Sequence, residues 1–202
     1  MQIYPLIGRL FCYPGGDYAD IIQQLRVELM FYADADLSGL KVVGQHFTGL
    51  PVSELQEYYI RTFDVNADCY LDIGYVLFGE ESKRGQFLLN MKSEQLKADN
   101  PCGTEFPDHL PNVLTLLPKM EDQMIREELV VSLLIPALKH MAGNFRTGEN
   151  IYLNLLNILI KILETDYSES LFEPFIINQE EIECASAYSC GMEFTKHKSR
   201  KH

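Results

Sequence analysis

Residues 53–64 read SELQEYYIRTFD, and the spacing of their side chains predicts the fold class. The mainly apolar positions recur at i, i+3, i+4, i+7 and i+8, one face of an α-helix, and are Leu55, Tyr58, Tyr59, Thr62 and Phe63. Ser53, three residues before Gln56, forms a capping-box signature, in which each side chain bonds the backbone N–H of the other residue. The stretch therefore predicts an amphipathic helix that begins near Ser53 and ends near Asp64.

The helical period also runs through the chain before this stretch. Residues 2–13 predict a first helix, which the breaker YPGG at residues 13–16 ends. Asp17 can cap a second helix. Residues 36–49 give a weaker helical signal because they contain three glycines, which lower helix propensity.

Two further helices are expected in the middle of the chain. Glu80 and Glu81 lead one whose shared face consists of Arg84, Phe87, Leu88, Met91 and Gln95. Asp108 is a plausible N-cap for the next, with its cap bond directed to the N–H of Leu110 because Pro111 has none. The buried stripe of that helix would be Leu110, Val113, Leu114 and Leu117.

The last helices precede a C-terminal tail. A long helix is expected over residues 121–146, with a kink at Pro136. Residues 149–165 are apolar nearly all round, which predicts a core helix. Beyond it, Phe172, Phe175, Ile176 and Ile177 could dock on the body or serve as an anchor. No strand alternation is found, so we expect one all-α domain of about eight helices over residues 1–177 and a mobile tail over 178–202.

Composition narrows the class of partner. The 202 residues fit one domain, and 47% apolar residues are enough for a core. The net charge of −12 repels phosphate backbones, so we expect no nucleic-acid partner. Four basic residues gather near the C-terminus, which leaves the rest of the chain still more acidic; they are Lys196, Lys198, Arg200 and Lys201. An acidic body would attract a basic peptide.

Cysteine usage and hydropathy predict a reduced, soluble, cytoplasmic chain. The five cysteines are odd in number and scattered, which argues against a disulfide framework. Cys184 and Cys190, with His197 beyond them, do not match a zinc spacing, so no metal is expected. No secretory signal is recognised at the start, and the apolar segment 151–163 is shorter than the ~20 residues a bilayer requires. We therefore expect no stable membrane insertion.

Asp108 and His109 allow two interpretations. A carboxylate beside an imidazole can orient a general base, which would suit a helical metal-dependent hydrolase. Adjacent residues at a helix start do not face each other, however, and no Ser or Cys nucleophile context accompanies them. A cap followed by a turn is the structural alternative. The lack of a catalytic constellation favours a binding module over an enzyme.

Other polar and aromatic positions also have a structural alternative. Tyr59 and Phe63 can face either a ligand or the core. Asp64 lies at a helix C-terminus, where its charge opposes the helix dipole; breaking a local rule makes it a candidate for function, with a solvated turn as the alternative. Arg84 can pair with Glu80 or Glu81 in its own helix.

The chain contains three motifs in order: LQEYYIRTFD at residues 55–64, KRG at 83–85 and EFPDHLP at 105–111. Their order and approximate spacing resemble those of the NarJ-like branch of the TorD-type molybdoenzyme maturation chaperones. The family pattern runs Leu-Gln-Glu-x-Tyr-Val-x-Thr-Phe-Asp, an Arg-Gly pair opening a helix, then Glu-Leu-Pro-Asp-His-Leu-Pro. LFCYP at residues 10–14 also resembles the family's start. Phe106 replaces the usual Leu, and Thr115 stands where Glu is frequent, so position 115 is assigned no function.

The resemblance implies a TorD-like all-α fold and a system-specific chaperone, without cofactor of its own. Such proteins hold the catalytic subunit of a respiratory molybdoenzyme, nitrate reductase above all, before molybdenum-cofactor insertion. They bind its N-terminal segment, which is related to a twin-arginine signal, and the chain is expected to be a monomer or homodimer. The client-binding residues would be Tyr59, Phe63, Asp64, Arg84, Asp108, His109, Leu110 and Pro111. A helical adaptor without redox clients is a further alternative.

Overall fold

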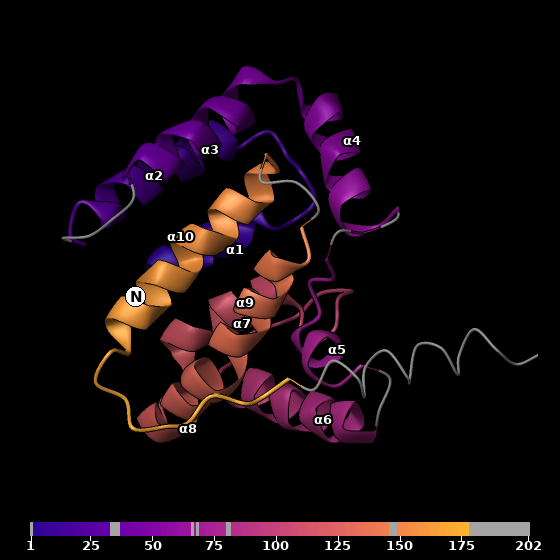
Figure 1. Cartoon of the computed structure of the whole chain (residues 1–202), viewed down its shortest axis with the longest axis vertical. Helices are drawn as coiled ribbons and strands as arrows, with labels where there is room; N and C mark the ends of the chain where they lie inside the picture. Colours follow the sequence, from indigo (N-terminus) through magenta and orange to yellow (C-terminus); the bar gives the residue numbers. More distant parts are fainter. Residues whose placement is uncertain are drawn as a thin grey trace, which may run out of the picture.

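The computed structural model describes residues 2–32, 37–65, 67, 69–79, 82–145 and 149–177, and it is built of helices (Figure 1). They are α1 (Ile3–Leu10), α2 (Tyr18–Leu29), α3 (Leu37–Gly49), α4 (Val52–Phe63), α5 (Ile73–Phe78), α6 (Ser82–Lys97), α7 (Leu110–Leu116), α8 (Gln123–Glu128), α9 (Ile135–Gly143) and α10 (Ile151–Asp166). A 3₁₀ turn (Leu117–Lys119) follows α7, and a π-helical turn (Leu129–Leu134) joins α8 to α9.

The expected all-α fold class is confirmed. In the described ranges the only β-type pairing is an isolated bridge between Asp72 and His109. None of the helices there is long and apolar enough to cross a bilayer. The predicted tail, residues 178–202, lies outside the described residues, as do Glu80 and Glu81.

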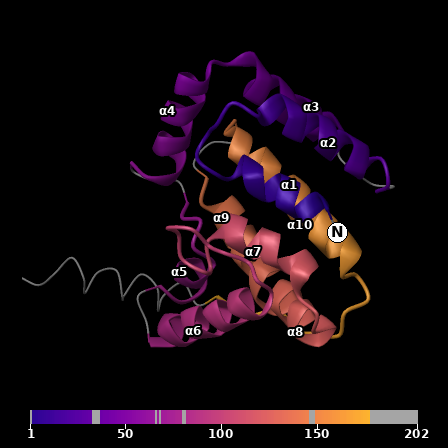
Figure 2. The same ribbon diagram turned by 180° about the vertical axis from the view of Figure 1, so that it is seen from behind.

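The core lies around α10 and α1. α10 packs against α3 and α9, and α1 packs against α2 and α7. Figure 1 shows α2 and α3 on one side of α10 and α7 to α9 on the other, and Figure 2 shows α1 across the opposite face. The Asn150 side chain accepts a hydrogen bond from the Tyr152 N–H at 3.0 Å, which caps α10. As its composition predicts, α10 is buried on most of its circumference, while Asn157 and Lys161 are exposed.

The helix predicted from residues 53–64 is confirmed as α4, but its predicted cap is wrong. α4 begins at Val52, directly after Pro51, and no side chain caps it. The Gln56 amide instead donates to the Pro14 carbonyl at 3.0 Å, which ties α4 to the loop after α1. Asp17 precedes α2 as expected, yet its carboxylate forms an ion pair with Arg9 and makes no cap bond. A tertiary partner has replaced the local one in both cases.

α3 forms although its three glycines lower helix propensity, because packing compensates. A Cβ built on Gly44 would lie 3.0 Å from Cγ2 of Ile22, so the absent side chain lets α3 approach α2 closely. α3 also packs on α10. Helices in proteins owe most of their stability to such tertiary contacts rather than to propensity.

The long helix expected over residues 121–146 departs from α-geometry at the predicted place. It begins at Gln123, and the π turn ends at Leu134, two residues before Pro136. The Ile135 N–H donates to the Val130 carbonyl five residues earlier. Pro136 has no N–H, so it cannot donate to the Ser132 carbonyl four residues before it. That carbonyl accepts a hydrogen bond from the backbone N–H of Phe175 at 2.8 Å.

The residues after α10 dock on the body. They leave α10 and run along α8 toward α5 (Figure 1). The Phe175 ring packs edge-on against Phe78, with 5.3 Å between ring centroids, and Ile177 is partly buried against the core. Docking is therefore confirmed for Phe175 and Ile177, whereas Ile176 between them is 85% exposed.

Candidate functional site

A short antiparallel pairing joins the starts of α5 and α7. The Leu110 N–H donates to the Leu71 carbonyl at 2.9 Å, and the Ile73 N–H donates to the Asp108 carbonyl at 3.1 Å. These bonds flank the bridge between Asp72 and His109. The pairing fixes two helix N-termini side by side, although 37 positions separate their N-cap residues Asp72 and His109.

Asp108 does not cap its own helix, so that prediction is wrong. His109 is the N-cap residue of α7 and makes no side-chain cap bond. The Leu110 N–H that Asp108 was expected to bind is taken by the Leu71 carbonyl. Asp108 Oδ2 accepts instead from the Gly74 N–H at 2.8 Å, in the first turn of α5. The carboxylate therefore stabilises the start of a neighbouring helix.

The Asp108 carboxylate is closely surrounded by other residues. Asp108 is fully buried, and no described residue hydrogen-bonds its Oδ1. Burial raises the pKa of Asp108, and the hydrogen bond from Gly74 lowers it in part. The negative charge of Asp72 raises this pKa further, whereas the positive charge of Arg84 lowers it. A Cβ on Gly74 would come within 2.8 Å of Asp108 Oδ2 and 2.7 Å of a Phe87 ring carbon, so only glycine fits.

Asp72, His109 and Arg84 form a polar cluster at this junction. Nδ1 of His109 lies 3.0 Å from one oxygen of Asp72, and the Arg84 guanidinium lies 3.7 Å from the other. The guanidinium also lies over two aromatic rings, 5.1 Å from the centroid of Tyr75 and 5.8 Å from that of Phe106. We call these five residues the Arg84 cluster. The predicted pairing of Arg84 with Glu80 or Glu81 falls on residues outside the described part of the chain.

The geometry also bears on the hydrolase alternative. Asp108 binds the Gly74 N–H, and Asp72 rather than Asp108 contacts the His109 imidazole. The adjacent pair therefore does not form an oriented base. Among the described residues, no group of three or more His, Cys, Asp and Glu side chains is arranged to hold a metal ion.

The predicted residues of α4 belong to an aromatic cluster that reaches the core. Tyr59 and Phe63 are buried, with ring centroids 4.9 Å apart, and Phe63 lies 4.6 Å from Tyr152 of α10. Both therefore face the core, the structural alternative for these residues. Tyr13 packs edge-on against Tyr59 at 5.6 Å and covers it from outside.

Asp64 lies at the C-terminal end of α4, as predicted, and is exposed. Burial raises the pKa of the Tyr59 phenol, and nearby acidic groups, among them Asp64 and Glu105, raise it further. The loop before α7 thus lies close enough to α4 for the Glu105 charge to act on Tyr59. Phe106, the residue after Glu105 in this loop, belongs to the Arg84 cluster.

The structure divides the eight predicted residues into two groups. Arg84 and His109 lie in the Arg84 cluster, where Asp108, Leu110 and Pro111 are buried beneath it. Tyr59, Phe63 and Asp64 lie on α4. Because Asp108, Leu110 and Pro111 are inaccessible, they position the site and do not touch a ligand in this conformation.

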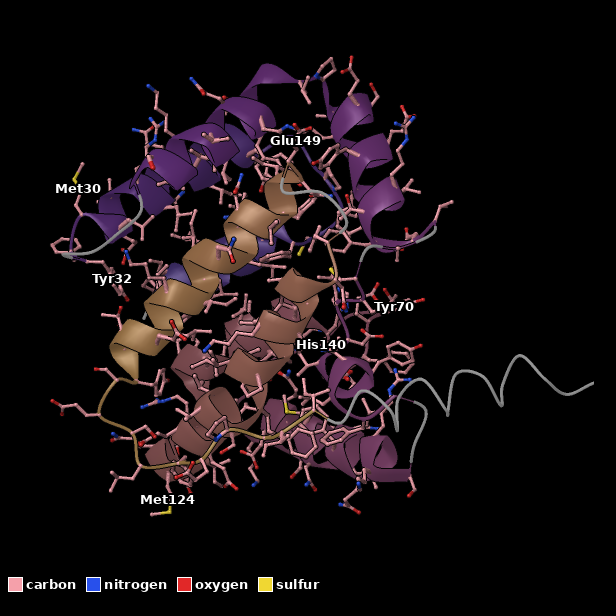
Figure 3. All side chains as sticks on the ribbon, in the orientation of Figure 1. Met30, Tyr32, Tyr70, Met124, His140 and Glu149 are labelled. Carbon is pink, nitrogen blue, oxygen red and sulfur yellow. The ribbon has the colours of Figure 1, made fainter. Side chains whose placement is uncertain are left out.

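Three partly exposed aromatic side chains lie in or beside the two groups. Tyr13, Tyr70 and Phe106 are 54%, 52% and 54% exposed. Tyr70 packs on Tyr75 at 4.7 Å and lies at the edge of the molecule between α4 and α5 (Figure 3). We call the exposed rings of Tyr13, Tyr70 and Phe106, together with the supporting rings of Tyr59 and Tyr75, the aromatic surface.

Sequence reasoning gave no role to Tyr13, Tyr70, Asp72 or Tyr75. A faint signal existed for Asp72, since an acidic residue directly before Ile73-Gly74 fits a helix N-cap position. No sequence signal pointed to the exposed tyrosines, because their exposure depends on how the loops pack in the folded chain. No protein-family model matches the sequence, and no curated protein matches it significantly.

Proposed function

We propose that this protein is a system-specific chaperone that binds the N-terminal segment of the apo catalytic subunit of a respiratory molybdoenzyme, of the nitrate-reductase kind, and assists molybdenum-cofactor insertion. The proposal combines the ordered motifs with one structural observation. Three aromatic side chains of the candidate site, Tyr13, Tyr70 and Phe106, are half-exposed and each packs on a neighbour, and the charges of Asp64 and Glu105 act on the Tyr59 phenol against which Tyr13 packs. Exposed rings grouped next to acidic side chains suit a basic amphipathic peptide.

The carboxylates near the aromatic surface differ in whether they already contact a basic side chain. Asp72 is already in contact with the Arg84 guanidinium and the His109 ring. Asp64 and Glu105 make no ion pair with any described residue and are exposed. They are therefore the carboxylates that can receive Lys or Arg side chains of a bound peptide, within a chain whose net charge is −12.

The aromatic rings would supply the apolar contact. Tyr13 rests on Tyr59, and Phe106 rests on the Arg84 guanidinium, so each exposed ring has a firm support. Aromatic side chains held in this way contribute contact area at a small cost in conformational entropy. Release of the client needs no nucleotide hydrolysis if the mature enzyme hides the peptide.

The test is calorimetry with a synthetic peptide of the N-terminal segment of a nitrate-reductase-type catalytic subunit from the same organism. We expect binding that weakens as salt rises, and weaker binding of a matched peptide whose Lys and Arg residues are replaced by Gln. Absence of binding to both the peptide and the apo subunit at low salt would contradict the proposal. Equal binding of an unrelated basic amphipathic helix would favour the adaptor without redox clients.

A further inference from the structure

The π turn before Pro136 exposes a backbone acceptor that the C-terminal segment uses. An α-helix would require residue 136 to donate an N–H to the Ser132 carbonyl, and proline cannot do so. The Phe175 N–H fills this position at 2.8 Å. Pro174 precedes Phe175 and has a fixed φ, which lowers the entropy lost when the segment docks.

Two apolar side chains accompany this hydrogen bond. Phe175 packs on Phe78, and Phe78 packs on Phe87 with 5.7 Å between ring centroids. Ile177, two residues after Phe175, is also partly buried, while Ile176 points outward. Alternate burial and a main-chain hydrogen bond are the features by which proteins recognise extended peptides.

The C-terminal segment contacts the body through only some of its residues. Leu171 is 95% exposed, and residues 171–177 form no helix or strand. A pocket remains between this segment and α8, lined by Met124, Glu127, Leu171 and Phe172, and Figure 3 shows Met124 at the outer edge of α8. Segments with few buried contacts open at low free-energy cost.

We propose that the surface formed by Phe78 of α5 and the Ser132 carbonyl of the π turn is a peptide-binding site, occupied in this structure by the chain's own residues 175–177. Its partner is an extended protein segment with an aromatic residue, a free backbone N–H at that residue, and an aliphatic residue two positions later. Residues 175–177 occupy this site as a tethered competitor, which a partner segment displaces. The site is distinct from the aromatic surface and does not depend on the identity of the client.

The first test uses the wild-type chain, labelled with ¹⁵N, and an unlabelled blocked peptide of sequence ESLFEPFII, corresponding to residues 169–177. A tethered segment competes at an effective concentration on the order of millimolar, so the peptide is added to that level. We expect the Phe175 amide resonance to move toward its random-coil position. A peptide with serine in place of the phenylalanine equivalent to Phe175 should leave it unchanged. An unmoved Phe175 resonance at millimolar peptide would overturn the proposal.

A matched pair of variants gives a second, independent measurement. Phe175→Ala removes the partly buried anchor and should raise the affinity for the added peptide by about tenfold or more, because the internal competitor is weakened. Ile176→Ala changes the exposed neighbour and should leave the affinity at the wild-type value. If the two variants bind the peptide equally, residues 175–177 are a fixed part of the fold and the proposal is wrong. The dispersion of the amide spectra establishes that both variants are folded.

Discussion

At the residue scale, the two carboxylates singled out in the sequence have different environments. Asp108 is buried against the start of α5, and Asp64 is exposed at the end of α4. Sequence reasoning placed Asp64 correctly because it depends on one helix alone. It misplaced Asp108 because the donor that Asp108 binds lies on Gly74, 34 residues away. A local cap rule cannot detect that the Leu110 N–H is already paired with the Leu71 carbonyl.

The pH dependence of stability should reveal the burial of Asp108. Its pKa is raised by burial, so the folded state holds this proton more tightly than the unfolded state. Its contribution to stability is therefore fully present below the unfolded pKa of about 3.9 and is lost as the pH rises through the folded pKa. Relative to wild type, Asp108→Asn should gain unfolding free energy across that window. Denaturant unfolding at a series of pH values measures this difference, and a difference that stays constant or falls with pH would contradict the account.

Removal of the Asp108 acceptor should also cost stability at neutral pH. Asp108→Ala leaves the buried Gly74 N–H without its partner, which we expect to lower the free energy of unfolding by about 1–3 kcal/mol. Urea unfolding measures the loss. A loss near zero would mean that the bond to Gly74 contributes nothing to the start of α5.

Substitution of Asp64, unlike that of Asp108, should affect client binding rather than stability. The charge of Asp64 opposes the dipole of α4, so Asp64→Asn should leave stability unchanged or slightly raised. Binding of a basic client peptide should weaken by roughly tenfold, if one charge-assisted contact worth ~1.5 kcal/mol is lost. Glu121→Gln, another exposed carboxylate, located just before α8, is the matched control and should change neither quantity. Thermal melts and peptide titrations decide the outcome: a destabilised variant with normal binding would make Asp64 structural.

At the element scale, apolar periodicity predicted α4, α6 and α10 well, because each helix buries one face or nearly its whole surface. Helix ends and special turns were predicted less well. The capping box at Ser53 failed because Gln56 bonds the Pro14 carbonyl, and the π turn was expected only as a kink at Pro136. Each of these features depends on a partner that is remote in the sequence.

Two glycines in neighbouring helices should respond to substitution with opposite sign. Gly74→Ala would force a methyl group against Phe87 and Asp108, so we expect a loss of about 1–3 kcal/mol in unfolding free energy. Gly85 lies in α6 with open space around its Cα, and Gly85→Ala should raise stability by about 0.5–1 kcal/mol. Chemical denaturation of both variants measures the two effects. If both substitutions changed the unfolding free energy equally, the close packing around Gly74 would not be the cause of the destabilisation by Gly74→Ala.

At the scale of the whole molecule, the sequence predicted an acidic helical body, and the motif order predicted where to look for a site. The sequence alone could not show which residues make up the aromatic surface. Tyr13, Tyr70 and Phe106 belong to three separate loops, and their exposure is set only in the folded chain. Conversely, Leu110 and Pro111 belong to the EFPDHLP motif, yet both are buried in the folded chain.

The central claim is that the aromatic surface binds the client's N-terminal peptide, and a titration of that peptide against two alanine variants tests it most directly. Phe106 and Leu89 are both exposed apolar residues, but only Phe106 belongs to the aromatic surface. The account predicts that Phe106→Ala weakens binding by about tenfold at an unchanged melting temperature, while Leu89→Ala binds as wild type does. Wild-type affinity in Phe106→Ala, or an equal loss in both variants, would contradict it.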